Sequence, residues 1–360
     1  MADGDVHRGR LHAEHVASGA RLEAVDGWLV PFDFGDVEAE YAALRHSASL
    51  LDLSLRGRLR LSGPDRATFL HNMVTNDVLA LRPRQGCNAV KLTLQGKIEG
   101  TMRILCDADT LWCDIDPGAA AQVRASLERH RIMEDVAIQD VTDEWVLLAV
   151  QGPDAAQVLA ALGADPRELV QPLQHAQFTV NDVSVRVTRL DHCGEGGFDV
   201  WVPAASAAIV WRAFLAAGGR AVGLRALDVR RIEAGIPWFG SELTSEYFPM
   251  EAGLETGWIS YTKGCYLGQE TISRLHHLGH VNRLLCGIVP EGDAAPAPGD
   301  ALLAVAKRVG TVTSVTRSPA LGRTIALGYV HREFAAAGTA ITIATTAGPT
   351  TARVAALPIA

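Results

Sequence analysis

The sequence predicts a mixed α+β protein with a small β-barrel at its C-terminal end. Three observations lead to this prediction. Short strand and helix patterns alternate through the first 280 residues, a strand–Gly-Pro-Asp–helix unit occurs twice, and mainly short strands follow residue 281. Elements in this order favour antiparallel sheets with helices over a doubly wound parallel sheet. No Gly-x-Gly-x-x-Gly motif opens a helix after a strand, so a dinucleotide-binding fold is not expected.

The N-terminal half contains a predicted helix and the two repeated units. Residues 36–54, "DVEAEYAALRHSASLLDLS", read as helical. Leucine and arginine alternate over residues 57–62, which is strand periodicity, and apolar residues at helical spacing follow "SGPD". The same order of strand, Gly-Pro-Asp and helix occurs in "WVLLAVQGPDAAQVLAALG" at 145–163, where Gly163 stands at a helix C-cap position. The repetition indicates two related α/β halves.

A third unit and a separate barrel complete the chain. Strand patterns over 183–203 lead into a helix from Ala204. From residue 281 onward, short strands broken by proline and glycine turns predict a small barrel or sandwich. We therefore predict two regions, 1–280 and 281–360, the first built from two interleaved subdomains.

The composition limits the class of protein. The chain has 360 residues, a net charge of -8 and a pI near 5.8. It lacks the clustered lysines and arginines that direct nucleic-acid binding normally needs. The N-terminus "MADGDVHRGR" is not a signal peptide, and no apolar run reaches the roughly 20 residues of a membrane span. We expect a cytoplasmic protein without membrane contact.

The six cysteines form no Cys-x-x-Cys pair, so free thiols are expected. A metal site could recruit His276, His277 and His280, but no second cysteine stands at ligand spacing, and we predict no metal.

The densest local motif is "KGCYLGQET", residues 263–271. Gly264 and Gly268 allow a tight backbone, and a helix opening at Gln269 would follow. A helix N-terminus and the nearby Lys263 would favour the thiolate of Cys265 and make it a functional thiol. The alternative is a partly buried structural thiol in a turn shaped by glycine.

These residues resemble a known family. "KGCYLGQE" matches the K-G-C-[FY]-x-G-Q-E signature of YgfZ-type proteins, relatives of the T-protein (aminomethyltransferase) of the glycine cleavage system. Other segments fall in the family's order: "EYAALRHSASLLDLS", "SGPDRATFLHNMVTNDV", "VQGPDA", "GEGGFDVWVP", "GLRALDVRRIEAG", "GSEL" and "PMEAGL". The resemblance covers nearly the whole chain.

The resemblance implies a three-domain body, with ferredoxin-like α/β units around a central channel that binds tetrahydrofolate, plus the C-terminal barrel. It also implies an accessory role in iron–sulfur cluster assembly or repair and, through client enzymes, in tRNA modification. Iron–sulfur proteins or their assembly machinery would then be partners. The alternative is a folate-dependent aminomethyl or methyl transferase, so enzymatic turnover stays open. A scaffold that has lost its ligand is a third hypothesis.

The resemblance also assigns residues to the folate site. Glu195 stands in the family's G-E-x-G-[FY] motif, where a carboxylate can accept two hydrogen bonds from a pterin edge. Arg231 stands in R-x-E-A-G and would either bind the ligand or brace the fold through Asp228 or Glu233. Tyr266 is assigned to the same set. Cys265 is hypothesised to face the channel.

One departure from the T-proteins concerns catalysis. Their Asp pair in G-G-I-x-D-D corresponds to Gly100 and Thr101 in "QGKIEGTMRI". Glu99 is adjacent, but a strand neighbour points to the other face. No carboxylate is therefore expected at this position, which weakens the prediction of aminomethyl transfer.

Overall fold

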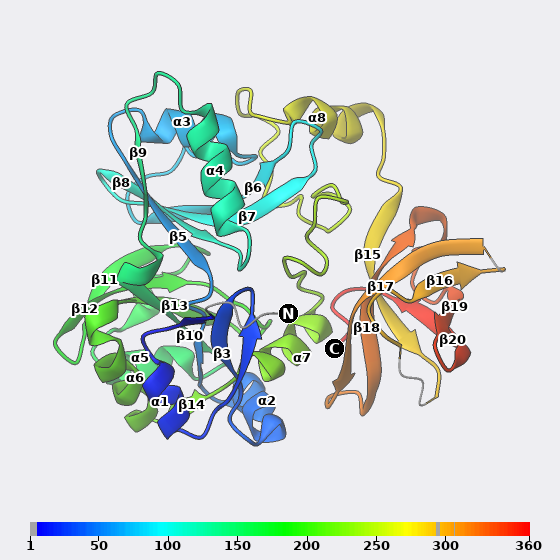
Figure 1. The fold of residues 1–360 in the computed structure, drawn as a ribbon, viewed down its shortest axis with the longest axis horizontal. Helices are drawn as coiled ribbons and strands as arrows, with labels where there is room; N and C mark the ends of the chain where they lie inside the picture. The colour runs from blue at the N-terminus through cyan, green and yellow to red at the C-terminus, as the bar shows by residue number, and fades with distance from the viewer. Residues whose placement is uncertain (1–5, 293–295, 306) are drawn as a thin grey trace.

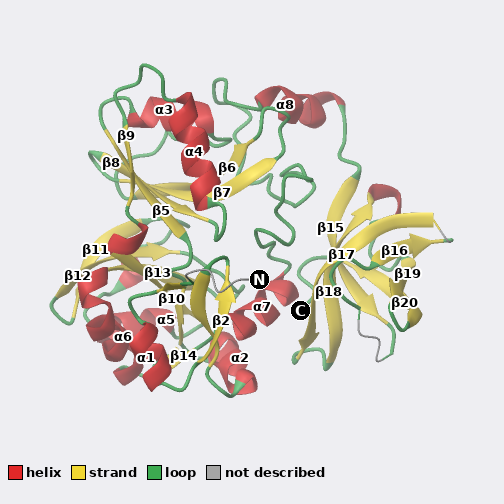
Figure 2. Cartoon of the chain, in the orientation of Figure 1, coloured by secondary structure: helices red, strands yellow, loops and turns green. Residues whose placement is uncertain are grey.

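The computed structural model describes residues 6–292, 296–305 and 307–360. The chain forms three lobes, and the segment between helices α7 (Leu224–Ala234) and α8 (Gln269–Leu278) runs through the space between them (Figure 1). Helices flank the sheets of two lobes, whereas the third lobe is built almost wholly of strands (Figure 2).

The first lobe holds a six-stranded sheet of order β11-β12-β13-β10-β4-β14 and a small sheet of order β1-β3-β2. Its strands are β1 (His7–Arg8), β2 (Arg21–Val25), β3 (Trp28–Asp33), β4 (Ser49–Asp52), β10 (Trp145–Gln151), β11 (His175–Val180), β12 (Val183–Arg189), β13 (Gly197–Pro203) and β14 (Arg220–Ala221). Its helices are α1 (His12–Ala17), α2 (Val37–His46), α5 (Ala155–Ala161), α6 (Ala207–Ala216) and α7.

The helix predicted over residues 36–54 is wrong in its second half. Helix α2 ends at His46, and the following residues form strand β4 inside the large sheet. Leu50 and Leu51 are both buried, but they belong to the two different apolar cores on opposite faces of that sheet. A strand can supply both cores because successive side chains alternate between faces. Tertiary packing on both faces thus explains the strand.

The second lobe holds a five-stranded sheet of order β6-β7-β8-β5-β9. Its strands are β5 (Gly57–Ser62), β6 (Gln85–Leu92), β7 (Ile98–Cys106), β8 (Thr110–Ile115) and β9 (Ala137–Asp140), and its helices are α3 (Arg66–Met73) and α4 (Ala120–His130). Apolar residues of the strands and of both helices form one buried core.

The two repeated units have the same local structure. Strand β5 leads through Gly63 into α3, and strand β10 leads through Gly152 into α5. The two glycines have φ values of +104° and +105°, and an added Cβ would lie 2.3 Å from a backbone carbonyl oxygen in each case. Only glycine fits such a turn without strain. The sequence pattern therefore identified two equivalent turns.

The third lobe is a closed barrel of order β15-β18-β17-β16-β19-β20. Its strands are β15 (Arg283–Pro290), β16 (Ala301–Ala304), β17 (Lys307–Ser318), β18 (Arg323–His331), β19 (Ala340–Thr345) and β20 (Gly348–Ala355). Single 3₁₀ turns occupy Thr142–Glu144, Pro166–Glu168, Ala204–Ser206 and Arg332–Phe334. The predicted α+β class with a small C-terminal barrel is confirmed. Within the described ranges, no helix is long and apolar enough to span a bilayer.

Candidate functional site

A cavity of about 410 Å³ lies where the three lobes meet. The second lobe contributes Thr101 and Arg103 from β7, and the barrel side contributes Leu285 and Leu357. Cavities of this size hold small molecules and cofactors. The cavity is therefore the candidate ligand site.

One side of the cavity is aromatic. Trp238, Phe239 and Trp258 line it, and all three come from the segment between α7 and α8. Indole and phenyl faces provide large, flat apolar contact area. This wall suits a ligand that contains a fused ring.

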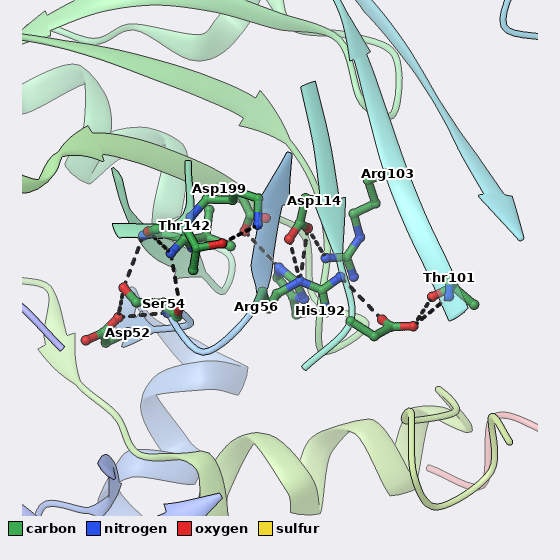
Figure 3. Close-up of polar contacts among 12 residues, drawn as sticks. Asp52, Ser54, Arg56, Thr101, Arg103, Asp114, Thr142, His192 and Asp199 are labelled. Carbon is green, nitrogen blue, oxygen red and sulfur yellow. Dashed lines mark hydrogen bonds and ion pairs between the residues drawn. The ribbon is translucent and has the colours of Figure 1, made fainter. Parts of the chain in front are cut away.

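Arg56 and Arg103, which also line the cavity, belong to a charged network (Figure 3). Arg56 Nε donates to both carboxylate oxygens of Asp114, at 2.7 and 3.0 Å, and Arg103 Nη1 donates to Asp114 Oδ2 at 2.8 Å. Burial alone would raise the pKa of Asp114, but the two guanidinium groups hold this pKa below its ordinary value. Asp114 is therefore ionised at neutral pH and fixes both arginines in place.

A carboxylate also lies against Thr101, where none was expected. The backbone N–H of Thr101 donates to Asp116 Oδ2 at 3.0 Å, its hydroxyl donates to the same oxygen, and Arg56 Nη2 approaches Asp116 Oδ1 at 3.3 Å. Asp116 and Thr101 both line the cavity. The expected lack of a carboxylate at this position is therefore wrong.

Sequence reasoning missed Asp116 because it follows the neighbouring strand, 15 residues further along the chain. The antiparallel pairing of β7 with β8 sets Met102 opposite Ile115 and brings Asp116 to Thr101. The only sequence signal is an aspartate directly after a strand pattern. Glu99 behaves as expected, because it bonds to Lys91 at 3.0 Å and to Ser126 of α4 at 3.1 Å, outside the cavity lining.

A histidine that the sequence analysis did not select also lines the cavity. His192 Nε2 lies 2.7 Å from Asp199 Oδ1, and both side chains are buried. The preceding Asp191 also lines the cavity, and its carboxylate accepts three backbone N–H groups at 2.8–3.0 Å. These bonds hold the turn that carries His192.

Glu195 lies on the same turn but is engaged by an arginine. Its Oε1 accepts a hydrogen bond from Arg230 Nη2 at 2.8 Å, and its side chain is 29% exposed. The cavity lining includes Asp191 and His192 but not Glu195. Its assignment to folate binding stays a prediction.

Arg231 lines the cavity and also braces the fold. Its guanidinium donates to Asp228 at 2.6 Å, to Glu242 at 3.0 Å and to the hydroxyl of Ser314 in the barrel at 2.9 Å. The expected brace through Asp228 is present, whereas Glu233 pairs with Arg230 instead. A ligand contact by Arg231 stays a prediction.

Lys263 is directed at the end of helix α3. Its ammonium donates to the carbonyl oxygens of His71, Val74 and Asn76 at 2.5, 2.7 and 2.8 Å. Burial lowers the pKa of Lys263 to about 8. Three carbonyl partners occupy all three of its donors. The structure therefore gives this lysine an anchoring position.

Cys265 is exposed and is absent from the lining of this cavity, so its orientation toward the channel stays a prediction. Helix α8 begins at Gln269 with Gly268 as its N-cap, so Cys265 does not lie at the helix N-terminus itself. Tyr266 is buried in an apolar cluster with Ile272 of α8, away from the cavity lining. The predicted roles of Cys265 and Tyr266 remain untested by this geometry.

Two of the histidines considered for a metal site, His276 and His277, lie on α8 and contact each other's rings. His276 stacks on Tyr261 with ring centroids 3.6 Å apart, and its Nδ1 lies 3.0 Å from Glu255. Across the described ranges, no group of three or more His, Cys, Asp or Glu side chains is arranged to hold a metal ion.

The chain is thus a three-lobed α+β protein with a cavity between its lobes. The chain matches two family models, the GCVT N-terminal domain over residues 11–260 and the glycine cleavage T-protein C-terminal barrel domain over residues 283–359. The chain therefore belongs to the glycine cleavage T-protein family.

Named relatives agree with this assignment. The aminomethyltransferase of Rubrobacter xylanophilus is 34% identical over 334 residues, covering 92% of this chain and 89% of the relative. That of Desulforamulus reducens is 30% identical over 355 residues, covering 97% of each. The crystal structure of glycine cleavage system aminomethyltransferase T from Bartonella henselae superposes with a TM-score of 0.90 at 25% identity, covering 99% of this chain and 98% of that one. The finer YgfZ-type assignment stays a prediction.

Proposed function

We propose that this chain is a tetrahydrofolate-dependent one-carbon transferase of the aminomethyl type. The observation that carries the proposal is the carboxylate of Asp116, which Thr101 and Arg56 hold in the wall of the central cavity. Curated relatives that match nearly the whole chain are named aminomethyltransferases. This activity is the alternative function that the sequence predicted, and it replaces the accessory role as the leading one.

The residues present fit a folate. The cavity combines an aromatic wall with carboxylates, and a carboxylate can accept hydrogen bonds from the N–H groups of a pterin. When bound, tetrahydrofolate supplies the nitrogen atoms that accept the one-carbon unit. In the proposed site Asp116 accepts a hydrogen bond from an N–H group of the ligand, and Arg56 and Arg103 hold the pKa of the neighbouring Asp114 below its ordinary value. The aromatic wall excludes water from the reacting groups.

Glu195, Arg231 and Tyr266 are proposed as further folate-site residues on the basis of family resemblance. Anaerobic calorimetry with tetrahydrofolate tests this, using Glu195→Ala beside the native protein. Loss of binding in the variant supports the assignment of Glu195, whereas unchanged affinity removes it. Because Glu195 pairs with Arg230, circular dichroism of the variant must show a native fold.

The test of the main proposal is turnover. The protein is added to a glycine cleavage system reconstituted without its own aminomethyltransferase, and ammonia release that depends on tetrahydrofolate is measured. We expect activity in the native protein and a loss of about 100-fold in Asp116→Asn. The matched control is Glu99→Gln, a carboxylate of the same lobe that lies outside the cavity lining. A native protein that binds no tetrahydrofolate or releases no ammonia would refute the proposal.

A second candidate is the accessory role in iron–sulfur cluster assembly or repair, with tRNA modification reached through client enzymes. Exposure favours Cys265 for this role, because it is the exposed thiol among six cysteines. Burial raises the pKa of both Cys87 and Cys193 to about 12, which makes them poor nucleophiles. The YgfZ-type assignment belongs to this candidate.

Complementation tests the second candidate. In cells that lack the chain, Cys265→Ser should fail to restore iron–sulfur enzyme activity, whereas the buried-thiol control Cys286→Ser should restore it. Full function of Cys265→Ser removes the accessory role of this thiol and leaves the transferase proposal untouched.

A further inference from the structure

The pair of His192 and Asp199 has no part in the proposed function described so far. Asp199 Oδ1 lies 2.7 Å from His192 Nε2, and the two side chains are 2% and 4% exposed, respectively. His192 lines the central cavity. Its other ring nitrogen, Nδ1, has no hydrogen-bond partner among the described residues and is not sealed inside the protein. One ring nitrogen is thus fixed by Asp199, and the other is free of hydrogen bonds to described residues on a side chain that lines the cavity.

A second buried histidine–aspartate pair, His15 with Asp52, lies away from the cavity. His15 Nε2 lies 2.9 Å from Asp52, and the ring packs against Trp211 and near Phe34. Its Nδ1 is buried without a partner, and neither residue lines the cavity. The two pairs have the same chemistry, and only the first can meet a ligand.

We propose that His192 is a proton-transfer residue of the central cavity and that Asp199 positions it. Asp199 accepts the Nε2–H and so fixes the tautomer in which Nδ1 carries the lone pair. The inference rests on the proposed transferase function, since it assigns a proton carrier to that reaction.

The proposed step balances in protons and electrons. His192 accepts at Nδ1 the proton lost by the ligand nitrogen whose lone pair forms the new C–N bond. It then returns this proton to the amine, which departs with the electron pair of the C–N bond that breaks. The attacked nitrogen loses one proton and the departing amine gains one, so no oxidant or reductant is required.

Charged groups around the cavity support a histidine that cycles between its two forms. Asp199 lies on β13 beside the ring, Arg56 precedes β5, and Asp116 follows β8. Arg56 contacts Asp116 and lies within electrostatic range of Asp199. In the proposed step, the carboxylate of Asp199 stabilises the imidazolium when it forms.

The first experiment measures protons rather than turnover. Tetrahydrofolate is titrated into the native protein and His192→Gln by calorimetry, in two buffers that differ in ionisation enthalpy. We expect native binding to exchange a proton between about pH 6 and 8, where imidazole titrates, and the variant to lose this exchange. His15→Gln is the matched control and should keep it. Equal proton exchange in native protein and His192→Gln overturns the inference.

The second experiment separates a chemical role from a structural one. In the reconstituted reaction, His192→Ala should lower kcat about 100-fold, and added imidazole should restore part of it. Asp199→Asn should lower kcat less and shift the pH profile, because the tautomer is no longer fixed. His15→Ala should show no imidazole rescue.

The outcomes distinguish the two proposals. A native protein without folate binding or turnover refutes the proposed function and this inference with it. Native turnover together with unchanged proton exchange in His192→Gln, or with an unchanged kcat in His192→Ala, overturns only the role of His192.

Discussion

Replacing Lys263 by methionine tests whether the signature lysine anchors the fold or activates the neighbouring thiol. Lys263 donates to three backbone carbonyls at the end of α3 and just beyond it, and it is 9% exposed. Methionine keeps a similar length and apolar stem but donates no hydrogen bond. We expect Lys263→Met to destabilise the second lobe and to leave the reactivity of Cys265 unchanged.

The expected magnitude follows from two opposing terms. Three hydrogen bonds from a charged donor contribute about 4.5–7.5 kcal/mol at about 1.5–2.5 kcal/mol each. Burial lowers the pKa of Lys263 from 10.5 to about 8, which corresponds to a cost of roughly 3 kcal/mol that methionine does not carry. The difference predicts a loss of about 1.5–4.5 kcal/mol in the free energy of unfolding. Urea unfolding at pH 7, where the lysine is charged in both states, measures it.

Two controls make the assay decisive. Lys307→Met removes an exposed lysine of the barrel and should change the free energy of unfolding by less than about 0.5 kcal/mol. The rate at which Cys265 reacts with a chromogenic disulfide should agree within about twofold between native protein and Lys263→Met. A tenfold slower reaction without loss of stability would refute the anchoring argument and assign thiol activation to Lys263.

Three further predictions concern the fold and its charges. Gly152→Ala should cost about 3 kcal/mol or more, because its Cβ would meet a carbonyl at 2.3 Å, whereas Gly27→Ala, with open space and φ of +80°, should cost about 1 kcal/mol. Arg231→Met should cost about 3–5 kcal/mol in urea unfolding, because buried Glu242 loses its partner. Arg103→Met should lower the free energy of unfolding, and the loss relative to the native protein should be largest at neutral pH, where Asp114 is ionised. Because the pKa of folded Asp114 lies below its ordinary 3.8, the stability difference between the two proteins in urea unfolding should become smaller as the pH falls below 3.8.

Local sequence patterns predicted most of the fold because turns and helix starts depend on the conformational preferences of neighbouring residues. The two Gly-Pro-Asp turns were found because a left-handed glycine followed by a helix start leaves a signature in sequence. Strand β4 was missed because Leu50 and Leu51 follow a helical pattern, and only burial on both faces of a sheet makes them a strand. That burial depends on segments about a hundred residues away, such as β10.

The site was predicted less well than the fold, because its residues are brought together by segments that are distant in the sequence. Glu195 and Arg231 were assigned from a motif, and the structure shows that both are held by protein partners. Asp116 and His192 carry no motif, and they reach the cavity through strand pairing and a turn held by Asp191. A carboxylate lost from one strand can be supplied by its neighbour, which a position-by-position comparison does not detect.

The barrel closes the cavity without supplying its chemistry. It contacts the other lobes through Ser314, which binds Arg231, and through the hydroxyl of Tyr329, which donates to the carbonyl oxygen of Glu242 at 2.9 Å. The residues that it and the C-terminal tail add to the cavity lining, Leu285 and Leu357, are apolar. The ionisable groups come from the other two lobes and from α7. In the proposed reaction the docked barrel therefore shields Asp116 and His192 from water, and weakening its contact with Arg231 by Ser314→Ala should reduce the measured transfer while leaving both side chains in place.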